Sequence, residues 1–229
     1  MIATNTQTHQ LIDNLKTPLL GTELRRMITA ANRADLCVGY FNLRGWSELV
    51  DSVETLQGGY VEESGYEEYR YCRLIIGMQR MPLDLIRDFF EQQNTGHIGP
   101  EQVKQAITDN STAVRIKRKV TEELRQQLTI GVSTAYDERV LRQLIRQLKS
   151  GQVVVKLYLR QLLHAKLYLA YQPDGSIGSY LGSSNLTLSG LMQQAEMNTD
   201  IFDTDTTQRL SLWFNNRWDD KLSLDITTE

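Results

Sequence analysis

Apolar residues along the first third of the chain alternate between short continuous runs and stretches with helical spacing. Residues 35–41 and 71–77 are apolar without a helical period, which is typical of buried strands. Residues 21–33 and 43–56 carry apolar side chains three and four positions apart, which predicts two helices. Residues 57–68 are acidic and begin with a glycine pair, so we expect an exposed loop there.

The middle of the chain is dominated by helical signals. Pro82 stands where a helix would begin, and residues 101–149 predict mainly helix, within a basic segment at about 99–150. From Arg115 to Lys149 there are nine basic residues and four acidic ones, a net charge of +5, although the whole chain carries −3. This segment forms either a solvated helix surface or a face that meets phosphate.

The last third returns to strand patterns. Residues 153–159 and 162–171 predict strands, and a turn at 173–176 leads into a further strand at 177–181, as in a hairpin. The sequence then predicts a strand at 197–202 and a terminal helix at 206–218. Strands that alternate with helices indicate an α/β fold. We expect a mixed β-sheet with helices on both faces, forming a single domain over residues 1–229.

Several classes of protein are disfavoured by composition. No apolar run approaches the roughly 20 residues that span a bilayer, and the first residues lack the basic and apolar regions of a signal peptide. We therefore expect a cytoplasmic protein without a membrane partner. Cys37 and Cys72 each lie in an apolar run and lack the spacing of a zinc site, so we interpret them as buried free thiols.

Candidate chemistry is concentrated between Leu162 and Gly190. If residues 162–171 form a strand, His164 and Lys166 project from the same face. Two basic side chains side by side repel when both are charged, but they suit an anion such as phosphate placed between them.

A small polar segment follows the next predicted strand. Gly182 allows close approach of a ligand to the backbone, and Ser183, Ser184 and Asn185 offer hydrogen-bond donors. The alternative interpretation is a turn that caps a helix starting near Thr187.

Taken in order, these residues resemble the HKD motif of the phospholipase D superfamily, in its single-motif nucleases. The resemblance lies in "HAKLYL", "GSSNLT" and the glutamate Glu196 of "QAEMN". A weaker resemblance joins "ADLCVGYFNLRGWSELV" and "YCRLIIG" to phospholipase D-like domains attached to bacterial helicases and restriction-type proteins. It implies a phospholipase D-like α/β/α sandwich. The family motif usually has aspartate five residues after the lysine, where this chain has Tyr171; Asp174 follows three residues later. That aspartate is mainly structural in the family.

The resemblance also implies a mechanism that needs neither a metal nor a cofactor. His164 would attack phosphorus and form a phosphohistidine. Lys166 and Asn185, with the substrate-binding hydroxyls of Ser183 and Ser184, would hold the phosphate oxygens, and Glu196 would orient the imidazole. A second histidine must protonate the leaving oxygen.

That second histidine is not apparent in the same chain. His9 and His97 lack a lysine two positions on, and both are typical of surface or loop histidines. The simplest solution is a homodimer in which each copy supplies His164 to a shared site.

Three hypotheses remain open at this point. The first is a metal-independent nuclease that hydrolyses DNA, in line with the motif and the basic segment. The second is a DNA-binding or targeting module with a degenerate site, serving a helicase or restriction partner. The third is an α/β domain whose match to the motif is accidental. A lipid substrate is disfavoured because the sequence shows no amphipathic membrane anchor.

Overall fold

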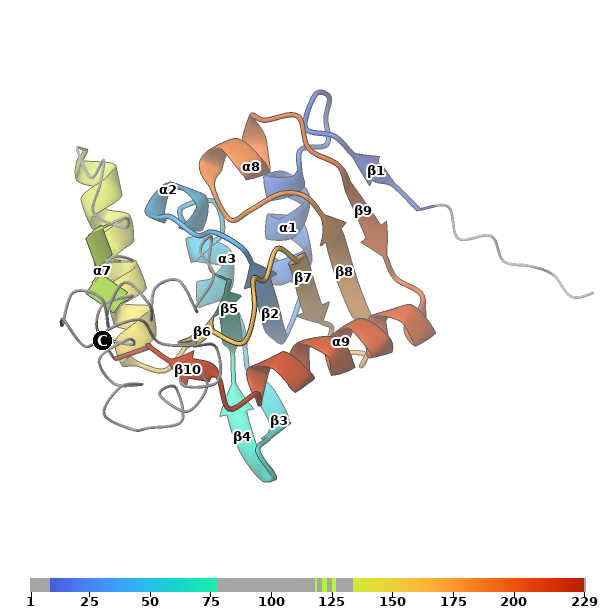
Figure 1. The fold of residues 1–229 in the computed structure, drawn as a ribbon. Helices are drawn as coiled ribbons and strands as arrows, with labels where there is room; N and C mark the ends of the chain where they lie inside the picture. Colours follow the sequence, from blue (N-terminus) through green and yellow to red (C-terminus); the bar gives the residue numbers. More distant parts are fainter. Residues whose placement is uncertain (1–8, 78–117, 119–120, 123–124, 127–133, 229) are drawn as a thin grey trace, which may run out of the picture.

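One mixed sheet forms the middle of the molecule (Figure 1). The computed structural model describes residues 9–77, 118, 121–122, 125–126 and 134–228. Within them the sheet has eight strands in the order β1-β9-β8-β7-β2-β5-β6-β10. The strands are β1 Leu11–Ile12, β2 Arg33–Val38, β5 Cys72–Ile76, β6 Val153–Tyr158, β7 Lys166–Tyr171, β8 Ile177–Gly182, β9 Asn198–Ile201 and β10 Ser223–Asp225.

The direction of the strands changes at the centre of the sheet. Strands β2, β5 and β6 run parallel, whereas β7 pairs with β2 in the antiparallel sense and β8 and β9 continue antiparallel. Every residue of β2 and β5 is buried, because helices cover both faces of this region. Their continuous apolar patterns, and the mixed sheet that was expected from them, are thus confirmed.

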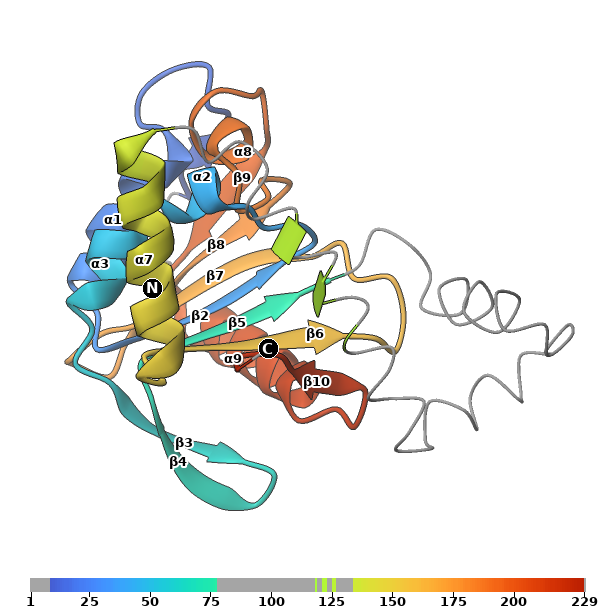
Figure 2. The same cartoon turned by 90° about the vertical axis from the view of Figure 1, so that its left-hand side faces the viewer.

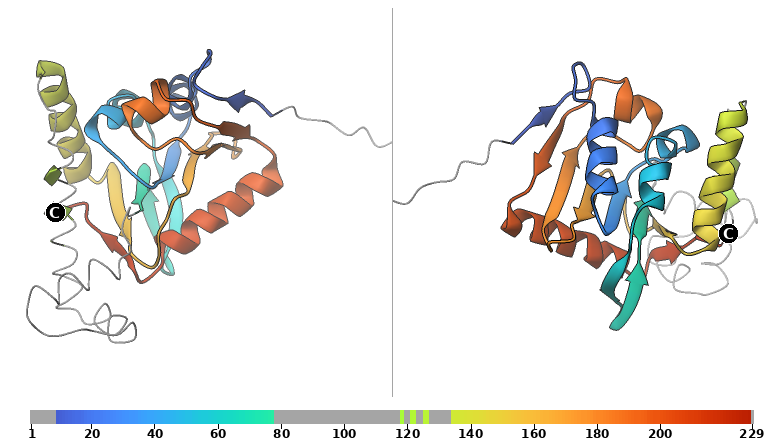
Figure 3. Two further views of the ribbon diagram at one scale, coloured as in Figure 1. Left: turned by 45° about the horizontal axis from the view of Figure 1, so that its top comes forward. Right: turned by 180° about the vertical axis from the view of Figure 1, so that it is seen from behind.

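Helices lie on both faces of the sheet, also as expected (Figures 2 and 3). Of the helices in the described part of the chain, five pack on one face, with a core that includes Leu24, Trp46 and Leu144, and one packs on the other through Phe214 and Trp218. The first group comprises α1 Leu20–Thr29, α2 Leu43–Trp46, α3 Val50–Glu54, α7 Ala135–Lys149 and α8 Leu188–Met192; the single helix opposite is α9 Thr204–Trp218.

The long helices begin at residues whose side chains satisfy free backbone N–H groups. Thr134 and Asp137 form a capping box at the start of α7, and Asp203 accepts from the Thr206 N–H over 2.9 Å at the start of α9. The polar residues before each apolar pattern therefore fix where the helix starts.

The expectation of a loop over residues 57–68 is wrong. Strands β3 Gly59–Glu63 and β4 Tyr66–Arg70 form a separate two-stranded hairpin that projects from the body (Figure 2). Ser64 and Gly65 at its tip both adopt positive φ, which a two-residue hairpin turn requires. The hairpin is stabilised by the Tyr60–Tyr69 ring contact at 4.9 Å and by an ion pair between Glu63 and Arg70 at 3.0 Å.

Other expectations differ in detail. The helix predicted over 43–56 is divided into α2 and α3 by a turn. The short edge strands β1 and β10 had no sequence signal. Cys37 and Cys72 are free and buried, as expected. The helix predicted after Pro82 and most of the basic segment lie outside the described residues.

Candidate active site

The predicted site residues meet at one end of the sheet, where β2 ends and β7 begins. Cys37 near the end of β2 is the register partner of Leu167 in β7, and Lys166 is the partner of Gly182 at the end of β8. The antiparallel pairing therefore brings the lysine of the first motif beside the Gly182–Asn185 segment of the second.

Gly39, directly after β2, is the point around which these groups converge. A Cβ atom built on Gly39 would lie 3.3 Å from Asn185 Oδ1, 3.3 Å from the Leu163 carbonyl oxygen and 3.5 Å from Lys166 Nζ. A side chain here would crowd all three groups. Glycine thus leaves room for the lysine and the asparagine to approach one another.

The amide of Asn185 is oriented by the backbone. Its Oδ1 accepts from the Tyr40 N–H over 2.9 Å, so the amide nitrogen points away from that contact. Among the described residues, no acceptor forms a hydrogen bond with this nitrogen. It therefore keeps two N–H donors for a ligand oxygen.

Lys166 is only 9% exposed, and its Nζ donates to the His164 carbonyl oxygen over 2.6 Å. Burial lowers the pKa of this ammonium below its ordinary value, although the negative charge of Glu196 opposes the shift. The contact links the side chain of Lys166 to the backbone of the histidine.

His164 does not lie on the strand, contrary to the expectation from sequence. Strand β7 begins at Lys166, and His164 belongs to the segment that leads into it, with an exposed side chain. The segment passes close to Gly77 at the end of β5: a Cβ on Gly77 would come within 2.1 Å of the Leu163 carbonyl oxygen. This close packing, rather than strand pairing, sets the course of the chain at His164.

Glu196 contacts Ser183 and not the imidazole. The Ser183 hydroxyl donates to Glu196 Oε2 and accepts from the Met197 N–H over 2.9 Å. In the described part of the chain, nothing hydrogen-bonds the His164 ring. The Glu196 carboxylate can therefore contact His164 only after its hydrogen bond with Ser183 is broken.

The two serines have different surroundings. Ser183 is exposed, whereas Ser184 is fully buried and accepts from Asn198 Nδ2 over 2.9 Å. The carbonyl of Ser184 also accepts from the Tyr168 hydroxyl over 2.9 Å. Ser184 therefore supports the loop from within, and only Ser183 presents its hydroxyl at the surface. Helix α8 does start after this segment, as the capping interpretation expected, but its cap is Thr187 and not a serine or asparagine.

Tyr171, at the usual aspartate position, lies at the opposite end of β7 from Lys166. Its hydroxyl hydrogen-bonds the Ser211 hydroxyl over 2.8 Å, and the Arg33 guanidinium lies 3.6 Å above its ring. Asp174 is exposed in the turn between β7 and β8, where it accepts from the Ser176 N–H over 2.9 Å. The hairpin is formed as predicted, and Asp174 stabilises its turn.

The other histidines do not enter the site. His9 is half-exposed beside β9 and contacts the Asp200 carbonyl over 2.9 Å. His97 lies outside the described residues. Within the described ranges, His164 is the histidine that stands next to the lysine and asparagine.

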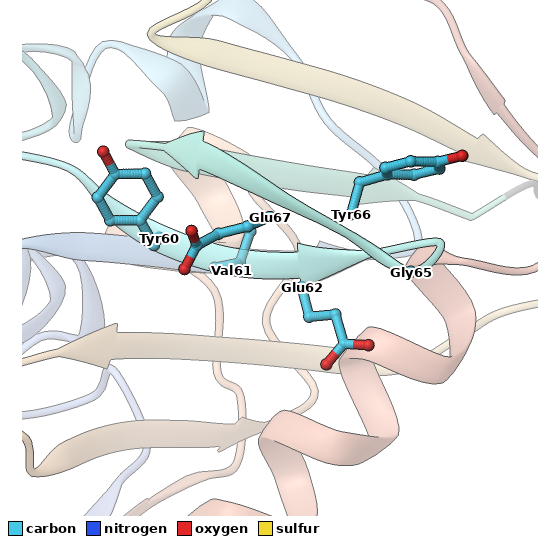
Figure 4. A pocket seen from close by; sticks show the side chains of 6 residues that line it. All are labelled: Tyr60, Val61, Glu62, Gly65, Tyr66 and Glu67. Atoms are coloured by element: carbon cyan, nitrogen blue, oxygen red, sulfur yellow. The ribbon is translucent and has the colours of Figure 1, made fainter.

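One surface pocket in the described part of the chain lies away from this site. It has a volume of about 330 Å³ and lies on the β3–β4 hairpin, lined by Tyr60, Glu62, Tyr66 and Glu67 among others (Figure 4). Over the described ranges, no three His, Cys, Asp or Glu residues are grouped so as to hold a metal ion. The helices that are described there include none with the length and apolar character needed to cross a membrane.

Comparison with known proteins gives a family and a fold. The family described as "Cardiolipin synthase, PLD-like domain" matches residues 102–218, more than half of the 229 residues. Phosphatidylserine synthase from Haemophilus influenzae Rd KW20 is similar over 96% of this chain and 40% of its own, with a TM-score of 0.50 and 18% identity. The chain thus spans less than half of that protein. No curated protein sequence matches.

Two other solved structures are similar at lower scores. Nuc from Salmonella typhimurium, a phospholipase D family member, is similar over 95% of this chain and 97% of its own, with a TM-score of 0.45 and 11% identity. NucT from Helicobacter pylori is similar over 96% of this chain and 99% of its own, with a TM-score of 0.47 and 13% identity.

The sheet, its helices and the family match together define a phospholipase D-like α/β protein. The chain belongs to the phospholipase D superfamily.

Proposed function

We propose that the protein is a metal-independent, cytoplasmic nuclease that hydrolyses DNA through a phosphohistidine at a homodimeric site. The observation that carries this proposal is the convergence of Lys166 and Asn185 around Gly39, with His164 on the adjoining segment. An ammonium and an oriented amide provide a positive, donor-rich site for phosphate oxygens. Such groups stabilise charge that builds up at phosphorus without reorganising during the reaction.

The first displacement begins with a ring nitrogen of His164, which forms a bond to phosphorus. The bond from phosphorus to the leaving oxygen breaks, and the partner's His164 gives that oxygen a proton. In the second displacement water attacks the phosphohistidine, and the partner's His164 takes a proton from the water. The bond between nitrogen and phosphorus then breaks, which restores His164.

The remaining residues hold the phosphate or adjust the charges around it. Lys166 and the free amide nitrogen of Asn185 donate to the non-bridging oxygens, and Ser183 presents a third donor at the same edge. Once substrate binds, Glu196 releases the Ser183 hydroxyl and accepts a hydrogen bond from the His164 imidazole instead. Ser184 acts through the loop and not on the substrate.

The homodimer is required because one histidine cannot both carry the phosphoryl group and protonate the leaving oxygen. His164 is exposed, which leaves it accessible to a second copy. A two-fold axis close to His164 would place both imidazoles at one phosphate. The exposed basic face of α7, with Arg139, Arg146 and Lys149, is available for the DNA backbone.

The decisive experiment is cleavage of single- and double-stranded DNA in EDTA by the wild type, His164→Ala and the matched control His9→Ala. We expect cleavage in EDTA that His164→Ala abolishes and His9→Ala retains. Protein denatured with SDS at alkaline pH after incubation with internally labelled DNA should carry the label only when His164 is present. Activity lost in EDTA, or retained in His164→Ala, would contradict the proposal.

Tyr171 supports a second candidate, a DNA-binding or targeting module that serves a helicase or restriction partner. The motif position lacks its usual carboxylate, and the His164 ring has no orienting contact in the described structure. This candidate predicts DNA binding without cleavage, unchanged in His164→Ala. An electrophoretic shift assay run beside the cleavage assay separates the two candidates.

A further inference from the structure

A buried group of charges lies on the face of the sheet that α9 covers. Asp35 on β2 and Arg73 on β5 are fully buried, and Arg33 on β2 is nearly so. Arg73 donates to the two oxygens of Asp35 over 2.8 and 2.7 Å, and Arg33 Nη1 lies 2.7 Å from each of them. One carboxylate thus pairs with two guanidinium groups.

The arrangement keeps Asp35 charged despite its burial. Burial alone would raise the pKa of the carboxyl, but Arg73 and Arg33 outweigh it and lower the pKa to about 2. Loss of this negative charge would leave two buried cations with reduced compensation, a situation far less favourable than the intact pair.

Tyr171 lies beside this group. Arg33 is the register partner of Tyr171 across the β2–β7 pair, so both side chains project to the same face of the sheet. Asp35, two residues further along β2, also projects there. The motif position that lacks a carboxylate is therefore the immediate neighbour of a buried carboxylate on the next strand.

We propose that Asp35 supplies from β2 the buried carboxylate that the HKD motif places at position 171, and that it positions Lys166 for catalysis. The catalytic half rests on the proposed function. The other half, that a carboxylate on β2 replaces the one that the motif places on β7, does not depend on the proposed function.

The positions of the strands explain how Asp35 can act at a distance. Asp35 belongs to β2, which ends at Val38 just before Gly39; Arg73 belongs to β5, which ends at Ile76 just before Gly77. Arg33 joins both to β7 by stacking on Tyr171, and β7 begins with Lys166. The three central strands that form the site are thus fixed to one another by the same ion group (Figure 1).

The contacts of Arg73 extend this group to the covering helix. Its Nη2 donates to Asn215 Oδ1 on α9 over 2.7 Å, and its Nη1 lies 3.4 Å from Glu63. Arg73 therefore keeps two acceptors when Asp35 is neutralised, whereas Arg33 keeps only the tyrosine ring among the described residues. A carboxylate moved to position 171 would face Arg33 directly.

Moving the charge between strands tests the proposal without any activity assay. Asp35→Asn preserves the shape but not the charge, and we expect it to lower the thermal midpoint by roughly 10 °C. Adding Tyr171→Asp should recover about half of that loss. The matched control adds Tyr171→Asn instead and should recover nothing. Equal thermal midpoints for the two double variants would overturn the proposal that Asp35 replaces the carboxylate of the motif.

Steady-state cleavage, measured well below each midpoint, tests the positioning role. Asp35→Asn should lower kcat about tenfold with KM within twofold, because alignment and not DNA contact is lost, and Tyr171→Asp should restore kcat in part. An unchanged kcat would make Asp35 merely structural and overturn this half. If the wild type cleaves no DNA, the proposed function fails. The thermal midpoints of the two double variants then still test whether Asp35 replaces the carboxylate of the motif.

Discussion

The backbone N–H of Tyr40 donates to Asn185 Oδ1 over 2.9 Å, although the two residues are 145 positions apart. Tyr40 follows β2 and Asn185 follows β8, so the contact joins the two halves of the site across the sheet. It also determines which end of the amide is free. The oxygen is occupied, and the nitrogen has no acceptor among the described residues.

Asn185→Asp tests this orientation. The aspartate can still accept from Tyr40, but it replaces the two N–H donors with an oxygen that repels phosphate. We expect kcat for DNA cleavage to fall by about 10²- to 10³-fold, the usual effect of removing one donor to a developing charge. The thermal midpoint should change little because the backbone contact survives.

Ser183→Ala provides the comparison, since it also removes a donor at the edge of the site. Its hydroxyl is already shared with Glu196, so we expect a smaller loss of kcat than for Asn185→Asp. If Asn185→Asp cleaved DNA as fast as the wild type, the amide nitrogen would have no part in binding phosphate.

Gly77→Ala tests how the histidine segment is held. The added methyl group would meet the Leu163 carbonyl oxygen, a backbone atom that cannot rotate away, at 2.1 Å. The segment from Leu163 to Lys166 must therefore move. Because a displacement of about 1 Å can cost 10²-fold in rate, we expect kcat to fall by about this factor.

Gly59→Ala is the control for this substitution. A Cβ at Gly59 meets nothing within 4 Å, and the residue does not require positive φ. Its cleavage rate should equal that of the wild type. A normal rate in Gly77→Ala, in a protein that is folded by circular dichroism, would show that Leu163 does not hold His164 in place.

The parts of the fold that sequence predicted well are those buried on both faces. Strands β2, β5 and β6 are made largely of apolar residues because helices cover them on either side, and such runs stand out without tertiary information. The β3–β4 hairpin was missed for the converse reason. Both strands are rich in tyrosine and glutamate and mostly exposed, so neither face has the apolar pattern of a core.

The candidate site likewise has residues that the sequence indicated and residues that it did not. His164, Lys166 and Asn185 could be nominated from local sequence and Glu196 only from the resemblance to the HKD motif, and their roles remain predictions. Gly39 and Gly77 were missed because their importance depends on which atoms the sheet brings beside them. A signal was nevertheless present, since a glycine stands at or near the end of each of two buried apolar runs. Asp35 could not be recognised either, because its partner Arg73 lies on another strand, β5, 38 positions away in the sequence.

The charge of Lys166 predicts a particular alkaline limit of DNA binding. Burial lowers the pKa of Lys166 below the ordinary value of 10.5, and the site needs the protonated ammonium. Affinity for DNA should therefore decline as pH rises through a midpoint lower than that of an exposed lysine. The affinity of the His164→Ala variant, measured from pH 7 to 10.5, gives this midpoint without a contribution from the imidazole.

Glu196→Gln should move that midpoint to lower pH, because the carboxylate raises the pKa of Lys166 and its removal favours the neutral amine. Glu138→Gln, at an exposed position on α7, serves as the control of equal charge and should leave the midpoint unchanged. A midpoint that moves to higher pH in Glu196→Gln would contradict this assignment of charges.

The exposed face of α7 predicts how DNA binding depends on salt. Arg139 and Arg146 lie two turns apart on this helix, and neither forms an ion pair with the described residues. The helix is joined to α2, next to the site, by the Trp46–Gln147 hydrogen bond of 3.1 Å. If both arginines contact phosphate, each accounts for about 0.9 of the slope of log affinity against log salt.

We therefore expect Arg139→Ala with Arg146→Ala to reduce the slope by about 2 and to weaken binding most at low salt. Both should be measured by fluorescence anisotropy in a His164→Ala background, so that the DNA stays intact. Arg209→Ala with Lys221→Ala removes the same charge from the part of the molecule around α9. An equal loss of slope in both double variants would mean that only net charge matters and that α7 is not the DNA-binding face.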